Sequence, residues 1–203
     1  MEGREEDKSY AVGHMSLGYV IGKLAAKILR TEINIPLVFA LSVIPDVDIL
    51  IPFVEHRGPT HSILAAFIVF IPIFAVYGKK AIPYLLAIVQ HPLIGDFFAG
   101  GRIQLLWPIT THQYGVEIGI KSLQNITTEW LAFIALVVIF VVSKDYLKIF
   151  DKNPSNLILI IPIFAVVFPA FLCFPIDVPP LLMPPHIFYS ILFLVAVING
   201  FRK

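Results

Sequence analysis

The chain has 203 residues, of which 58% are hydrophobic and only 14% are charged, and its mean hydropathy is +0.85. A soluble domain is about half apolar and about a quarter charged, so this composition indicates an integral membrane protein. The net charge of +1 gives no sign of nucleic-acid binding, and a single cysteine excludes a disulfide framework within the chain.

Seven apolar segments predict an all-α, polytopic transmembrane helical bundle, since a span needs about 20 residues. They are residues 11–29, 36–54, 61–77, 81–99, 127–142, 155–174 and 185–200. The first carries Lys23 and Lys27 and could instead lie flat at the interface, leaving six spans. Its Gly18 and Gly22 favour close packing against another span.

We divide the chain into three parts on this basis. A polar N-terminal tail (1–10) precedes a membrane domain (11–126) with four spans, a polar segment and the candidate metal site, and residues 127–203 add three further spans.

Basic residues in the connections predict the orientation in the cell membrane. Ten lie on one side of the predicted spans: Lys23, Lys27, Arg30, Lys79, Lys80, Lys144, Lys148, Lys152, Arg202 and Lys203. Five lie on the other: Arg4, Lys8, Arg57, Arg102 and Lys121. We expect the first set to be cytoplasmic, which makes the 55–60 loop and the 100–126 segment extracytoplasmic.

Histidine and aspartate interrupt the apolar segments, although an ionised Asp near a bilayer centre costs about 2.5–3.5 kcal/mol. On the predicted topology one set falls in a single, outer leaflet: His14, Asp46, Asp48, His56, His61, His91 and Asp96. Any one of them could be a helix–helix hydrogen bond. Their clustering favours a site for a divalent transition metal, and imidazole with carboxylate and no thiolate suits zinc, with manganese or iron(II) as alternatives. His112 and His186 are interpreted as structural or interfacial.

Local patterns give these residues different expected roles. Pro45 breaks a helix just before Asp46 and Asp48, which are two apart and share no helical face, so either both ligate in an unwound segment or one orients a histidine. Thr60 is the expected N-cap of the next helix, with His61 in its first turn, kept neutral by the helix dipole. Arg57 is expected to hold an anion such as a phosphate oxygen.

Several strings, in order over about residues 11–108, resemble the YdjM-type family of membrane-bound metal-dependent hydrolases, in which hydrolase activity is itself a prediction. They are GH at 13–14, IPDVD at 44–48, HRGPTHSIL at 56–64, the pair His91 and Asp96, and LLWP at 105–108. The resemblance implies the same site: His14, Asp46, Asp48, His56, Arg57, His61, His91 and Asp96.

One spacing departs from that family, whose histidine and aspartate are usually four residues apart. Here HPLIGD separates His91 and Asp96 by five, which on a regular helix rotates Asp96 by about 140°. A bulge with an i→i+5 hydrogen bond, prompted by Pro92 and Gly95, would restore the alignment. Without such a bulge, either His91 or Asp96 is not a metal ligand.

The pattern is typical of metal-assisted hydrolysis of an ester or phosphoester at the outer membrane interface. Asp46 or Asp48 would act as base or orienter, and Arg57 would steady developing negative charge; the substrate would be lipid-linked. A metal-ion or proton transporter is an alternative, although the inner halves of the spans are apolar. A membrane scaffold with a structural metal is another.

Overall fold

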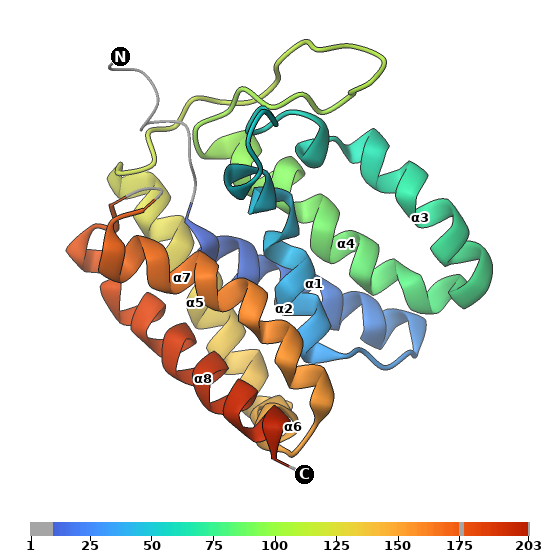
Figure 1. The fold of residues 1–203 in the computed structure, drawn as a ribbon, viewed down its shortest axis with the longest axis vertical. Coiled ribbons are helices and arrows are strands. Elements are labelled where there is room, and N and C mark those ends of the chain that lie inside the picture. Colours follow the sequence, from blue (N-terminus) through green and yellow to red (C-terminus); the bar gives the residue numbers. More distant parts are fainter. Residues whose placement is uncertain (1–9, 175–176, 203) are drawn as a thin grey trace.

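The computed structural model describes residues 10–174 and 177–202, and the predicted polar tail lies outside this part of the chain except for Tyr10. The fold is all-α, as predicted, with the helices arranged as a bundle (Figure 1). The helices are α1 (Ala11–Leu29), α2 (Ile35–Val43), α3 (Ile63–Tyr77), α4 (Ile82–Gln90), α5 (Leu123–Val142), α6 (Asp145–Phe150), α7 (Ile160–Leu172) and α8 (Met183–Phe201).

Shorter helical turns extend or connect these helices. They are the 3₁₀ turns η1 (Ile44–Leu50), η2 (Pro59–His61), η3 (Gly78–Ala81), η5 (Pro154–Leu159) and η6 (Pro180–Leu182), and the π-helical turn η4 (His91–Asp96). The segment between η4 and α5 is irregular, with isolated bridges between Ala99 and Ile118 and between Ile103 and Tyr114.

Among the residues that the structure describes, four helical stretches are long and apolar enough to cross a membrane: Ile63–Asp96, Leu123–Val142, Pro154–Leu172 and Pro180–Phe201. The first of these reverses direction at Gly78, whose backbone has φ 54°, so that α3 and α4 form an antiparallel hairpin (Figure 1). α1 and α2 are not among these stretches. α1 carries two lysines, which make it less apolar, and α2 has only nine residues before the chain continues as the 3₁₀ turn η1.

α1 is a central helix of the bundle and packs against α2, α4 and α5. The glycines predicted to permit close packing are at these contacts. A Cβ added at Gly18 would lie 1.9 Å from Ser42 Oγ, and one at Gly22 would lie 3.4 Å from Val38 Cγ1. The prediction of close packing is therefore confirmed.

Lys23 lies in the second half of α1, away from His14 near the start of the helix, and its ammonium group has a buried partner. Lys23 forms an ion pair with the buried carboxylate of Asp145 at the start of α6, and Tyr19 donates a hydrogen bond of 2.9 Å to the same carboxylate. These contacts connect α1 to the α5–α6 junction and explain how a largely buried helix accommodates a lysine.

Candidate metal centre

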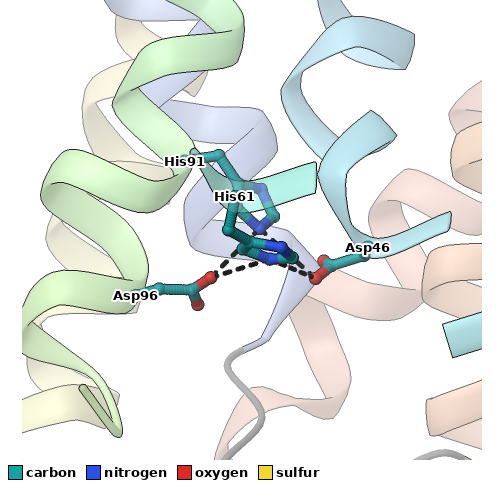
Figure 2. Close-up of side chains that lie close together, drawn as sticks. All are labelled: Asp46, His61, His91 and Asp96. Atoms are coloured by element: carbon teal, nitrogen blue, oxygen red, sulfur yellow. Dashed lines mark ion pairs between the residues drawn. The ribbon is translucent and has the colours of Figure 1, made fainter. Parts of the chain in front are cut away.

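Four side chains from three different elements, η1, η2 and η4, meet at one end of the bundle. Figure 2 shows the rings of His61 and His91 between the carboxylates of Asp46 and Asp96. His61 Nε2 lies 3.1 Å from Asp96 Oδ2 and 3.5 Å from Asp46 Oδ1. His91 Nε2 lies 3.3 Å from Asp46 Oδ1 and 3.4 Å from Asp96 Oδ2. One ligand atom from each residue lies within 4.8 Å of the others, so this four-residue cluster could hold a metal ion.

The π-helical turn η4 brings His91 and Asp96 to the same place despite their unusual spacing. The turn runs from His91 to Asp96 and contains Pro92. Because a π-helix bonds i to i+5, residues five apart share a face. Of the two alternatives, the structure has the one with the bulge, which explains how an HxxxxD spacing directs both side chains to one point.

The hydrogen bonds of the two histidines leave their Nε2 atoms facing the carboxylates. His91 Nδ1 lies 2.7 Å from the backbone oxygen of Ser42, which can only accept, so Nδ1 carries the proton. His61 Nδ1 lies 3.2 Å from the Asp48 carboxylate. Both Nε2 atoms are buried without a hydrogen-bond partner. A histidine that binds a metal commonly donates its other ring N–H to a carbonyl or carboxylate in this way.

Asp46 and Asp48 face different directions because η1 is a tight 3₁₀ turn. Asp46 belongs to the four-residue cluster, whereas Asp48 lies behind His61 and accepts hydrogen bonds from Thr60 and from His56, whose Nδ1 is 2.9 Å away. Of the two arrangements considered, the geometry matches the one in which one aspartate faces the metal position and the other orients a histidine. Asp48, His56 and His61 also form a second group of metal-ligand composition.

His14 flanks the cluster from α1. Its ring stacks on that of His91 with centroids 3.6 Å apart, and its Nε2 lies 3.5 Å from Asp96 Oδ1. Gly95 permits this approach, since a Cβ added there would lie 2.2 Å from His14 Cε1. His14 is therefore beside the cluster rather than one of the four residues that meet in it.

Arg57 does not present its guanidinium to open space, contrary to the role expected of it. The side chain is 2% exposed, its Nη2 donates to Asp96 Oδ1 at 3.1 Å and to the Ala99 carbonyl at 3.0 Å, and its Nη1 donates to the Gly101 carbonyl at 2.7 Å. The expectation of an anion-holding arginine is therefore corrected. Arg57 instead positions Asp96 and the chain that follows η4.

The turn that carries His61 also differs from expectation. Ser62, not Thr60, is the N-cap of α3, and His61 ends the preceding 3₁₀ turn instead of entering the helix. The Ser62 hydroxyl donates to the carbonyls of Leu105 and Trp107, at 3.1 and 2.7 Å. The HRGPTHS and LLWP strings are thus neighbours in space, and the second supports the turn that orients His61.

Two residues near the cluster were not among the candidates from the sequence, and only one of them had a sequence signal. The backbone carbonyl of Ser42 fixes the His91 ring, and no side-chain type signals such a role. Glu129 of α5 is 6% exposed and lies against Gly13 at the start of α1. A carboxylate inside an apolar segment was a usable signal for Glu129, as it was for Asp46 and Asp96.

The fold and the cluster define a polytopic membrane protein with a buried group of histidines and aspartates able to hold a metal ion. The model of the family described as YdjM inner membrane protein matches residues 10–176, so the chain belongs to that family. Its location is the cell membrane. No curated protein and no solved structure is significantly similar to the chain.

Proposed function

We propose that the protein is a metal-dependent hydrolase that binds zinc, or alternatively manganese or iron(II), at Asp46, His61, His91 and Asp96. The observation that carries the proposal is the convergence of two buried imidazole Nε2 atoms, without hydrogen-bond partners, on two carboxylates. Imidazole and carboxylate are ligand types that zinc, manganese and iron(II) accept, and hydrolysis requires that the ion keep a further position for water. Without a bound cation, the two neighbouring carboxylates would repel each other, and the two buried Nε2 atoms would lack a partner, both at a cost in free energy.

The roles of the chain's own residues follow from their positions. A zinc ion held there would supply a Lewis acid for an ester oxygen and a water-derived nucleophile at neutral pH. Asp46 has a side chain that is 19% exposed, against 0% and 1% for His61 and Asp96, so water would reach the ion on the side of Asp46. Asp48 holds His61 in orientation, and Arg57 holds Asp96.

The proposed substrate is an ester, most naturally a phosphoester, reached from the extracytoplasmic interface. The split of basic residues supports that side, and the membrane location supports a lipid-linked molecule. The test is hydrolysis by the purified protein of bis-p-nitrophenyl phosphate, p-nitrophenyl phosphate and p-nitrophenyl butyrate, after treatment with EDTA and after reloading with zinc or manganese.

We expect turnover that is lost with EDTA, restored by metal, and absent in His91→Ala. His112→Ala is the matched control, because His112 is exposed and its ring contacts only Tyr114 among the ring contacts of the described residues. Metal binding without turnover of any ester would favour a structural metal instead.

A further inference from the structure

A cavity of about 290 Å³ lies beside the four-residue cluster, between η1, α7 and the start of α8. Its volume is near the low end of the roughly 300–1,000 Å³ typical of small-molecule sites. Most of its wall is aliphatic or aromatic, contributed by η1 and α7: Ile44, Val47, Leu50, Ile161, Phe164 and Phe168. We call it the η1–α7 cavity.

The η1–α7 cavity shares Asp46 with the cluster. Asp46 is the one cluster residue in its wall and also the cluster residue with the most exposed side chain, at 19%. The open side of the candidate metal centre therefore faces this cavity. A molecule that reacts at the centre by this route must place its remaining atoms against an apolar wall.

His186, which lines the cavity, has a ring nitrogen without a hydrogen-bond partner. His186 is 0% exposed, and its Nδ1 lies 2.8 Å from the Leu182 carbonyl, which can only accept, so Nδ1 carries the proton. Its Nε2 is then an acceptor, and it is buried without a hydrogen-bond partner. A hydroxyl on a bound molecule would satisfy it, whereas a pure hydrocarbon would not.

The edge of the cavity is open toward the apolar outside of the bundle. Leu50 is 57% exposed and Phe164 is 46% exposed, although both line the cavity. In a membrane-spanning bundle such exposed apolar side chains face lipid. A hydrocarbon chain could therefore enter sideways without passing through water.

We propose that the η1–α7 cavity holds the hydrocarbon chain of a lipid phosphoester, with the ester beside Asp46 and a hydroxyl of the same molecule donating to His186 Nε2. The inference rests on the proposed function and names its substrate class. A peptide segment is a poorer occupant, since its backbone polar groups would find few partners on this wall.

The first test fills the cavity and compares two substrates. Ala165 lines the cavity, whereas Ala170 of the same helix does not, so Ala165→Phe and Ala170→Phe are a matched pair. We expect Ala165→Phe to lower turnover of dioleoyl phosphatidylglycerol, a phosphodiester with free hydroxyls, in nanodiscs at least about tenfold, and to leave bis-p-nitrophenyl phosphate within about twofold. Ala170→Phe should leave both unchanged. Equal effects of the pair on the lipid would overturn the inference.

The second test needs no turnover, so it separates this inference from the proposed function. Phosphatidylglycerol with a diazirine on its acyl chain is photolysed in nanodiscs, and labelling of residues 161–169 is compared with labelling of the exposed helix α3. We expect dioleoyl phosphatidylglycerol to compete for labelling at 161–169 and Ala165→Phe to reduce this labelling, with α3 unaffected. Labelling at 161–169 that behaves like α3 would overturn the inference even if esters are hydrolysed. Should Ala165→Phe fold poorly, Phe168→Ala enlarges the cavity and should increase the labelling.

Discussion

Arg57 and Asp96, 39 residues apart in the chain, form a buried hydrogen bond of 3.1 Å between Nη2 and Oδ1. The same guanidinium binds the carbonyls of Ala99 and Gly101, and a Cβ added at Gly100 would lie 2.6 Å from Nη1. The Arg57 guanidinium thus holds the Asp96 carboxylate of the candidate metal centre and the chain that follows η4. It also supplies the positive charge that makes two nearby aspartates tolerable in the bundle.

Arg57→Ala should therefore weaken metal binding and not merely slow turnover. Loss of a residue that holds a metal ligand typically costs about 10–100-fold in affinity. Competition with a chelating dye would measure it. Arg102→Ala is the matched control, since Arg102 pairs with Glu117 at the exposed surface and should bind metal normally. Unchanged metal affinity with lost turnover in Arg57→Ala would restore the role of an anion-holding residue.

Asp46 and Asp48 should behave differently although they are two residues apart. Asp46→Asn removes a charged oxygen that faces His61 and His91 Nε2, so metal binding should be lost or nearly so. Asp48→Asn keeps the cluster but weakens the partner of His61 Nδ1, so affinity should fall by roughly 10–100-fold. Isothermal titration with zinc distinguishes them. The reverse order of severity would mean that the second group, with Asp48 and His56, holds the metal.

Gly95 should be required for the packing of His14 beside the cluster. In Gly95→Ala the new methyl group would lie 2.2 Å from His14 Cε1 and 2.4 Å from His14 Nδ1, so the ring or η4 must move. We expect a lower melting temperature and weaker metal binding. Gly119→Ala is the control, because nothing lies within 4 Å of a Cβ added there. Equal melting temperatures for the two variants would show that η4 adapts without cost.

Asp145 should make the stability of the protein depend on pH at the end of the bundle away from the cluster. Burial opposes ionisation, but hydrogen bonds from Lys23 and Tyr19 favour the carboxylate more strongly, so the pKa of Asp145 lies below its usual range. An unfolded aspartate has a pKa of about 3.9. The stabilisation is therefore complete above about pH 5 and is lost as pH falls through the folded pKa.

The corresponding comparison is between wild type and Asp145→Asn, melted in EDTA so that metal contributes to neither. The melting temperature of wild type should exceed that of the variant at pH 7, and the difference should shrink below pH 4. Lys148→Ala is a control, since Lys148 approaches Asp145 from an exposed position. A difference that stays constant with pH would exclude a role for the Asp145 charge.

The orientation of the site can be tested by cysteine labelling in a Cys173→Ser background. Glu55 is exposed beside the cluster, and Lys80 is exposed at the far end of the α3–α4 hairpin. Glu55→Cys should react with an impermeant thiol reagent in intact spheroplasts, whereas Lys80→Cys should react only after lysis. The opposite pattern would place the candidate metal centre on the cytoplasmic side.

The sequence predicts a helix well where a long apolar segment forms a single regular helix. The segment predicted at 11–29 has the bounds of α1. The HPLIGD spacing left two alternatives, of which the structure has the π-helical turn. Histidine and aspartate stand out because the bilayer makes them costly, so the four residues that converge were all among the candidates.

Roles that depend on chain path are not visible in the pattern. Arg57 looks free for an anion until the loop after η4 brings Asp96, Ala99 and Gly101 to it. His186 looks structural until the packing of α7 and η1 leaves a cavity against it. The N-cap at Ser62 instead of Thr60 follows from the carbonyls of the distant LLWP segment.

The most direct test of the account is the metal content of the purified protein. Inductively coupled plasma mass spectrometry should find at least about one transition-metal ion per chain in wild type and in His112→Ala, as expected for one four-ligand site. His61→Ala should have lost it, because His61 contributes an Nε2 that faces both carboxylates. Wild-type protein that carries no metal after mild purification, and takes up neither zinc nor manganese on titration, would contradict the account.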